Sequence, residues 1–161
     1  AVIRSTFLVG FPGETAREFE ELLEFQEKAA IDWLGVFTYS REEDTPAYKM
    51  RGQLFHKLSE PLARKRKTIL EESQIPLTEK RLDRFVGREL RVLIEEEIPG
   101  DGMFLGRGYL HAPEVDGLVV VHGEGLKAGE RVLCRIKGRN GIDLEGETLL
   151  TSSSLSSIIF R

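Results

Sequence analysis

Two glycines around a proline stand near the start of the chain, in the stretch TFLVGFPGET (residues 6–15). Gly10 and Gly13 allow the backbone to approach a ligand closely, because glycine has no side chain in the way. A helix that begins near Thr15 would present free N–H groups to an anionic or polar ligand. The alternative is an ordinary corner in which Pro12 and the glycines only turn the chain, and a lone glycine-rich corner favours that interpretation.

A second polar cluster lies in FTYSREEDTP (residues 37–46), where hydroxyl groups, an arginine and three acids gather after an apolar stretch. Ligands of α/β sheets bind at the carboxyl ends of the strands, so this cluster suits a polar substrate. A solvated loop has the same composition, and composition alone slightly favours the loop.

A third candidate is GRGYLHAPEVDG (residues 106–117). Glu114 and Asp116 flank Val115, so in an extended chain their carboxylates point to the same side, away from a core. The pattern predicts either a loop with solvated acids or an acidic recognition surface. Such a surface fits a basic protein partner better than RNA.

The remaining candidates indicate no metal centre. Cys134 is the only cysteine, so the chain holds no cysteine-bound cluster, and its alternation with Val132 and Ile136 places it on the inner face of a strand. The three histidines, His56, His111 and His122, have no metal-ligand spacing. The basic run of residues 64–67 is spread around a helix and forms no single-faced patch.

The first half has the pattern of a βαβ unit. Residues 2–9 and 33–39 are apolar strands, and between them the capping box of Thr15 and Glu18 opens a helix with one apolar face. Such strands are expected to pair in parallel. A long helix is expected to follow, with Ser59 as its N-cap and an end near Phe85. Pro61 then falls in the first turn of this helix, and Pro76 should kink or split it.

The second half has short alternating stretches at residues 90–94, 117–121, 131–137 and 142–145, each bounded by Gly, Pro or Asn-Gly. This spacing predicts a small antiparallel barrel or sandwich, with a boundary near residue 86. The serine-rich end, residues 150–161, is expected to be a disordered tail.

Composition and charge argue against some classes of protein. Of 161 residues, 40% are hydrophobic and 31% charged, and no apolar run approaches the ~18 residues of a membrane span. The net charge of −4 argues against strong nucleic-acid binding. The chain starts with Ala1 in an apolar stretch, from which we expect a piece of a longer protein, and one cysteine fits a reducing, cytoplasmic setting.

The order of these motifs resembles the radical-SAM methylthiotransferases: RSTFLVGFPGET, GVFTYSREEDTPA, RLDRFVG, GRGYLHAPEVDGLVVV and GIDLEGE. The resemblance implies an α/β plus all-β fold. Residues 1–86 would be the C-terminal part of a partial (β/α) barrel with a long linking helix, and residues 87–149 a five-stranded OB-like TRAM barrel. It also implies that Leu8, Val9, Gly10 and Phe11 line the adenine of S-adenosylmethionine. Substrate contacts are expected from Tyr39, Arg107, Glu114 and Asp116.

Two branches of the family differ in substrate. The RimO branch adds a methylthio group to the β-carbon of an aspartate in small-subunit ribosomal protein S12, whereas the MiaB branch modifies an adenosine of transfer RNA. APEVDG and DLEGE resemble the RimO branch, and the acidic second half fits a basic ribosomal protein, free or in the ribosome. RNA binding by the TRAM barrel, or a non-catalytic binding role for this piece, are the alternatives.

The family binds S-adenosylmethionine and two [4Fe–4S] clusters. This sequence lacks the CxxxCxxC motif that holds the radical-SAM cluster, so catalysis is expected only in a longer parent chain, and the piece alone is expected to be inactive. Two positions depart from the family. Asp44 replaces a usual glycine, and Pro76 interrupts a helix that the family keeps continuous.

Overall fold

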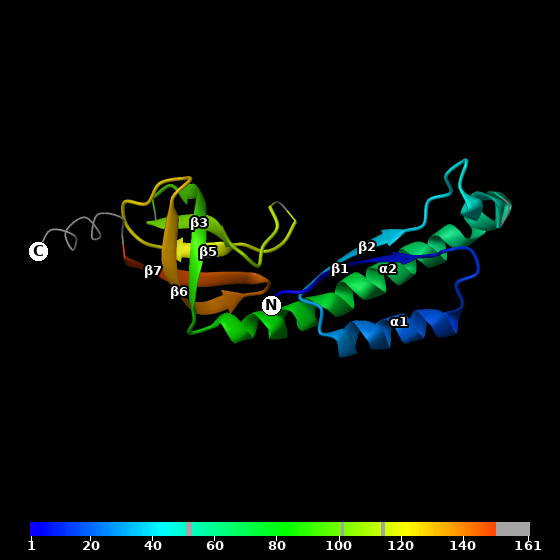
Figure 1. Cartoon of the computed structure of the whole chain (residues 1–161), viewed down its shortest axis with the longest axis horizontal. Coiled ribbons are helices and arrows are strands. Elements are labelled where there is room, and N and C mark those ends of the chain that lie inside the picture. The colour runs from blue at the N-terminus through cyan, green and yellow to red at the C-terminus, as the bar shows by residue number, and fades with distance from the viewer. Residues whose placement is uncertain (51–52, 101, 114, 151–161) are drawn as a thin grey trace, which may run out of the picture. The chain divides into compact units, whose positions relative to one another are not determined.

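The computed structural model describes residues 1–50, 53–100, 102–113 and 115–150. The chain divides into two compact units, residues 1–78 and 79–161, and the division falls within the long helix α2 (Figure 1). Of the predicted tail, residues 150–161, only Leu150 is described, and it ends a strand rather than starting a tail. Residues 151–161 lie outside the described residues, as does Glu114.

The first unit is the predicted βαβ unit followed by a long helix. Strand β1 (Arg4–Val9) pairs in parallel with β2 (Trp33–Thr38), and α1 (Ala16–Ala29) connects them. The predicted capping box is confirmed, since the Thr15 hydroxyl accepts from the Glu18 N–H and the Glu18 carboxylate accepts from the Thr15 N–H at 2.7 Å. One face of the sheet forms the core with α1 and α2, through Phe7, Val9, Phe19, Ile31, Val36 and Leu70.

The other face of this two-stranded sheet carries exposed apolar side chains. Leu8 and Phe37 are directly opposite each other across the two strands, and they are 50% and 60% exposed. Alternation along β1 therefore sends Phe7 and Val9 into the core and Leu8 to the surface.

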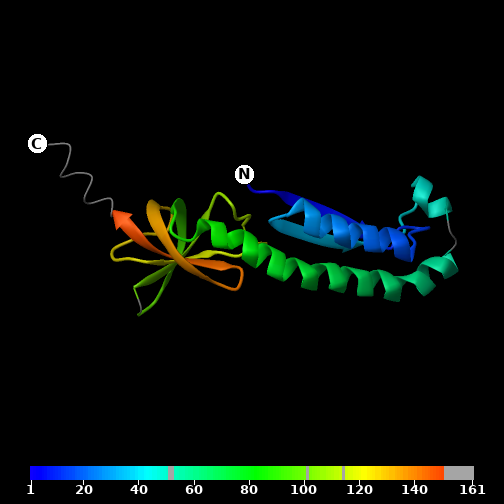
Figure 2. The ribbon, with the colours of Figure 1, turned by 90° about the horizontal axis from the view of Figure 1, so that it is seen from below.

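Helix α2 (Gln53–Leu82) differs from the prediction at its start and in its continuity. It begins six residues before Ser59, so Ser59 is no N-cap, and it runs unbroken past Pro61 and Pro76 (Figure 2). The short 3₁₀ turns η1 (Pro46–Lys49) and η2 (Asp83–Phe85) precede and follow it.

Side-chain bonds to the βαβ unit explain why Pro76 does not split the helix. The amide of Gln74 donates to the Ile31 carbonyl at 2.9 Å, and the hydroxyl of Thr78 donates to the Asp32 carbonyl at 2.7 Å. These buried bonds hold the helix on both sides of the proline, which removes only one helical N–H.

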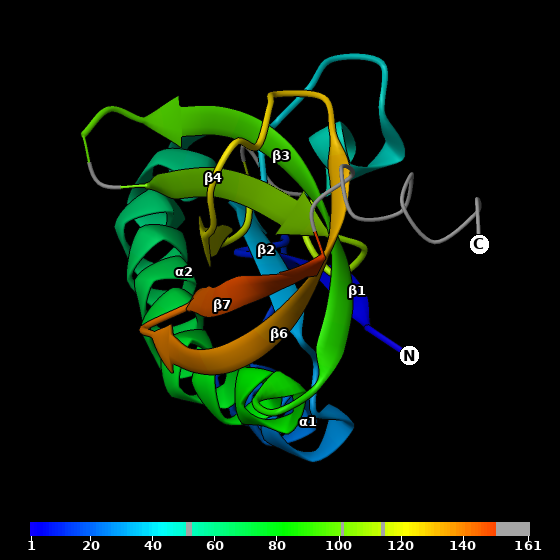
Figure 3. The same cartoon turned by 90° about the vertical axis from the view of Figure 1, so that its left-hand side faces the viewer.

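The second unit contains a closed barrel of five strands in the order β3-β4-β5-β7-β6 (Figure 3). The strands are β3 (Glu89–Ile98), β4 (Met103–Gly108), β5 (Val119–His122), β6 (Arg131–Asn140) and β7 (Asp143–Leu150). The expected small barrel is confirmed, but it is mixed rather than antiparallel, because β5 pairs in parallel with β7.

Strand β4 is the strand that the sequence pattern missed. Its second half, Gly106-Arg107-Gly108, looks like a turn because of its two glycines. A Cβ on Gly106 would lie 2.6 Å from the Leu93 carbonyl oxygen, so this glycine allows β3 and β4 to approach closely. The predicted inward position of Cys134 is confirmed, since its side chain is fully buried with Val132 and Ile136.

Candidate functional site

The glycine-rich corner after β1 is held against α2 by a buried ion pair. Glu14 and Arg66 form this pair, with side chains only 13% and 6% exposed. The other Glu14 carboxylate oxygen accepts from the Gly10 N–H at 2.8 Å, and Arg66 also donates to the Thr15 carbonyl at 3.0 Å. Glu14, the acid of the GFPGET motif, therefore stabilises this turn through its bonds to Gly10 and Arg66.

Gly10 is required at this corner for a packing reason. Its φ is +78°, and a Cβ there would lie 2.3 Å from the Cβ of Ala63 in α2. The close backbone approach that the motif predicts is thus an approach to a helix. This contact occupies only the side of Gly10 that faces α2. It is therefore compatible both with an ordinary corner and with a corner that approaches a ligand.

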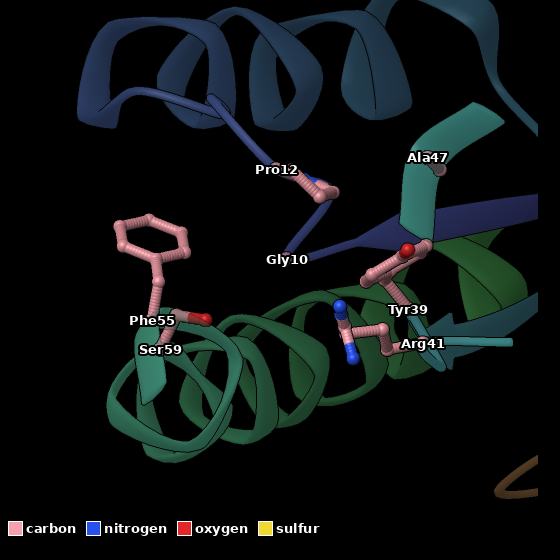
Figure 4. Close-up of a pocket in the computed structure, with 7 residues that line it drawn as sticks. All are labelled: Gly10, Pro12, Tyr39, Arg41, Ala47, Phe55 and Ser59. Atoms are coloured by element: carbon pink, nitrogen blue, oxygen red, sulfur yellow. The ribbon is translucent and has the colours of Figure 1, made fainter. Parts of the chain in front are cut away.

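The carboxyl ends of β1 and β2 lie side by side, and the segments after them form a small pocket. The Tyr39 N–H donates to the Val9 carbonyl at 2.8 Å, and the rings of Phe11 and Tyr39 meet edge to face at 5.3 Å. The pocket has a volume of about 10 Å³ and is lined by Gly10, Pro12, Tyr39, Arg41, Ala47, Phe55 and Ser59 (Figure 4). Such a volume holds at most one water molecule.

Arg41, the arginine of the polar cluster after β2, lines this pocket, although composition gave it no separate role. Its guanidinium lies 3.5 Å over the ring of Tyr48 and donates to the Tyr48 carbonyl at 3.0 Å. Its Nε is buried and has no hydrogen-bond partner among the described residues. Figure 4 shows the guanidinium pointing into the group of lining residues. A buried donor in this position suits a polar ligand atom.

The four residues expected beside the adenine have different environments. Leu8 and Phe11 are 50% and 40% exposed, so their side chains are available to a ligand. Val9 is fully buried in the core, and only its backbone reaches the strand end.

Asp44, in the loop beyond β2, has a φ of +63°. This left-handed conformation explains why glycine suits this position.

In the barrel, two motifs that are distant in sequence come together. The Leu118 N–H, directly after APEVDG, donates to the Asp143 carboxylate of DLEGE at 2.9 Å. A Cβ on Gly117 would lie 2.2 Å from the Ile142 carbonyl oxygen, so only glycine fits between the two segments. These contacts start the parallel pairing of β5 with β7.

The expected substrate residues of the barrel lie in two places. Asp116 is in a bend rather than an extended strand, and its carboxylate accepts from the Ala112 N–H at 2.7 Å within its own loop. Arg107 lies on β4, where it pairs with Glu95 at 2.8 Å. The structure thus gives Asp116 a loop-forming role that the alternating pattern did not predict.

Two other polar groups of the barrel are poor catalysts. Burial raises the pKa of the Cys134 thiol to about 11, so this thiol stays protonated near neutral pH. Burial also lowers the pKa of His111 to about 4, against a smaller opposing effect of Asp143. The neutral ring fits its contact, because Nδ1 accepts from the Gly108 N–H at 3.2 Å.

His111 makes barrel stability depend on pH. Its pKa in the folded chain lies below the ordinary value of 6.5, so the stabilisation is complete above pH 6.5 and is lost as pH falls towards 4. We expect a loss of about 1–2 kcal/mol between about pH 7 and about pH 5, measured by hydrogen exchange of the barrel strands. His111→Asn keeps an acceptor but cannot titrate, and an equal loss in that variant would contradict the assignment.

No group of three or more metal-binding side chains occurs in the described ranges. The single cysteine of the sequence is buried inside the barrel. The residues present here therefore do not fit an iron–sulfur cluster.

Among the described residues, none of the helices combines the length and the apolar character that a membrane crossing requires.

Comparisons with known proteins agree with the motif analysis. Residues 86–149 match the family described as "TRAM domain". Proteins named "Ribosomal protein uS12 methylthiotransferase RimO" are similar over most of the chain. The one from Treponema denticola is 44% identical over 89% of this chain and 32% of its own length, and the one from Nostoc punctiforme is 44% identical over 92% and 33%.

A third such protein, from Rippkaea orientalis, is 42% identical over 96% of this chain. The chain spans about a third of the length of these curated relatives. The resemblance to the RimO branch is thereby confirmed at the level of sequence. Residues 86–149 match the TRAM domain. Over about nine-tenths of its own length, the chain is homologous to RimO-type methylthiotransferases, and it corresponds to about one third of the length of each relative named here.

Proposed function

We propose that this chain acts as part of a RimO-type enzyme in the cytoplasm. The enzyme would add a methylthio group to the β-carbon of an aspartate in ribosomal protein uS12. The observation that carries the proposal is the similarity to RimO proteins across both units, since a match to the TRAM domain alone would not select this reaction. In such an enzyme, S-adenosylmethionine and two [4Fe–4S] clusters supply the chemistry when bound.

The first unit would provide one wall of the S-adenosylmethionine site. Leu8 and Phe11 offer exposed apolar surface at and beside the carboxyl end of β1, and Arg41 offers a buried N–H donor beside it. Because the pocket itself has only about 10 Å³, it is too small for an adenine. We therefore propose that the opposite wall belongs to the part of the enzyme that this chain does not span.

The barrel would hold the substrate, and we propose residues 87–149 as the bounds of this TRAM domain. Arg107 and the loop that contains Glu114 and Asp116 are the proposed contacts, together with Tyr39 from the first unit. The residues of this chain would bind and orient uS12. Because the sequence has a single cysteine, which is buried inside the barrel, we assign the bond-making steps to the rest of the enzyme.

A reconstituted full-length enzyme tests this function. We expect that, with clusters and S-adenosylmethionine, it increases the mass of uS12 by one methylthio group at a single aspartate, detected by peptide mass spectrometry. Transfer RNA is supplied in a parallel reaction. Modification of a transfer RNA adenosine in place of uS12 would assign the chain to the MiaB type, and modification of neither would favour a non-catalytic binding role.

A further inference from the structure

An open groove lies between α1 and α2 in the first unit, where the two helices run side by side (Figure 2). Its volume is about 400 Å³, which falls in the range of clefts that bind ligands. Leu23 of α1 and Pro76 and Leu77 of α2 give it apolar walls, and Glu24 and Glu27 of α1 add carboxylates. The strand ends that form the small pocket beside Arg41 contribute no residue to this α1–α2 groove.

The base of the α1–α2 groove is held by a buried hydrogen-bond network. The amide of Gln26, which is 1% exposed, donates to the Leu70 carbonyl at 3.0 Å and to the side-chain oxygen of Gln74 at 2.9 Å. The Ser73 hydroxyl donates to the Gln26 side-chain oxygen at 2.9 Å. A buried network whose members are paired rigidifies its surroundings, so the groove is formed before any ligand binds.

The charged groups around the groove are acidic. Helix α1 carries five acids and two bases, and residues 68–77 of α2 add two acids and no base. Glu24 accepts from Lys28 at 2.8 Å, whereas Glu27 has no cation within ion-pair distance among the described residues. The next base along α2, Lys80, does not line the groove. Apolar walls beside unneutralised carboxylates favour a ligand that is both apolar and cationic.

Pro76 adds a backbone acceptor to the groove. A helical residue donates its N–H to the carbonyl four residues earlier, and proline has no N–H to donate. The Glu72 carbonyl therefore lacks its usual helical donor, and it points along α2 towards Pro76, which lines the groove. A lysine or arginine side chain of a ligand can donate to such a carbonyl.

We propose that the α1–α2 groove binds a short basic segment of a partner protein, in which an apolar side chain is flanked by lysine or arginine. The apolar side chain would lie between Leu23 and Leu77. The flanking cations would pair with the two carboxylates of α1 and donate to the Glu72 carbonyl. The same carboxylates would repel an acidic segment or a nucleic acid. Tyr39, the proposed uS12 contact of this unit, does not line the groove, so this partner is additional to the proposed reaction.

The test is the affinity of the whole 161-residue chain for a fluorescein-labelled peptide, measured by anisotropy. The peptide has about 14 residues, with leucine at helical spacing among lysines. We expect saturable binding of one peptide per chain. Glu24→Gln with Glu27→Gln should weaken binding about fivefold to tenfold at low salt, because two ion pairs are lost. Leu77→Gln should weaken it about tenfold through lost apolar contact.

Pro76→Ala separates binding from folding. Alanine restores the helical N–H that the Glu72 carbonyl lacks, so the variant should unfold at a higher urea concentration than the original chain. The same bond occupies the acceptor, so the peptide should bind about threefold more weakly. A loss of affinity in a more stable variant cannot result from unfolding.

The matched control is Glu21→Gln with Glu71→Gln, which removes the same charge from α1 and α2 outside the groove. Each of these acids is also in an exposed pair with a base one helical turn away. The control should change the affinity less than twofold. An equal loss in both double variants would overturn the proposal, as would the absence of saturable binding or an unchanged affinity in Pro76→Ala.

Two other occupants give different results. Self-association of the chain in sedimentation, abolished by Leu77→Gln, would overturn the proposal in favour of a second copy of the chain. Failure of the longer enzyme to bind a peptide that this chain binds would overturn it in favour of a segment of that enzyme. The peptide assay needs no cluster or uS12, so its result is independent of the methylthiotransferase function.

Discussion

Gly117→Ala is expected to destabilise the barrel by about 3 kcal/mol. The added Cβ would lie 2.2 Å from the Ile142 carbonyl oxygen and 2.9 Å from a carboxylate oxygen of Asp143. The strand ends must therefore separate, which also weakens the hydrogen bond from the Leu118 N–H to Asp143. Gly117 is not among the glycines with positive φ, so alanine causes no backbone strain there and the effect is steric.

Hydrogen exchange measured separately for the peptides of β5 and β7 reports this effect directly. The only tryptophan, Trp33, belongs to the first unit, so its fluorescence should remain native in the variant. Gly138→Ala is the matched control, because Gly138 is also in the barrel, also lacks positive φ and has nothing within 4 Å of an added Cβ. Equal exchange in the two variants would refute the steric argument.

Local patterns were sufficient to predict the elements whose signals lie within a few residues. The capping box at Thr15 and Glu18 and the inward position of Cys134 follow from spacing alone, and the structure has both. The parallel pairing of β1 and β2 follows from the short helical connection between them. These features depend on neighbours in sequence, so a single sequence contains the information.

The remaining features depend on contacts between distant residues. The role of Gly10 is set by Ala63 in α2, and the position of Leu118 is set by Asp143. Strand β4 was missed because its glycines serve close strand packing rather than a turn. The parallel pairing of β5 with β7 likewise has no local signal, since it requires β7 to insert between β5 and β6.

The candidate sites show the same limit. The polar cluster after β2 was recognised from composition, but only the structure selects Arg41 from it, through a buried Nε without a partner in the described residues. In the barrel, Arg107 was expected from the family resemblance, whereas its place opposite Leu93, which is itself opposite Arg131, depends on the register of β4, β3 and β6. Such neighbours cannot be recognised before the register is known.

The buried ion pair of Glu14 and Arg66 gives the second large expected effect. Arg66→Met should destabilise the first unit by about 3–5 kcal/mol, because it leaves the Glu14 carboxylate buried without its cation. It also removes the donor to the Thr15 carbonyl and the contact of the guanidinium with the Phe19 ring at 5.1 Å. Urea unfolding followed by the fluorescence of Trp33, which is 6% exposed, measures this loss in the unit that contains the pair.

A double-mutant cycle separates the charge effect from the loss of packing. Adding Glu14→Gln to Arg66→Met should restore about half of the lost stability, since a neutral amide can still accept from the Gly10 N–H. Arg64→Met is the control in the same helix, because its pair with Glu60 is largely exposed and should contribute less than about 1 kcal/mol. If Arg66→Met costs no more than Arg64→Met, the pair does not hold the corner. The close contact with Ala63 alone would then explain why position 10 is a glycine.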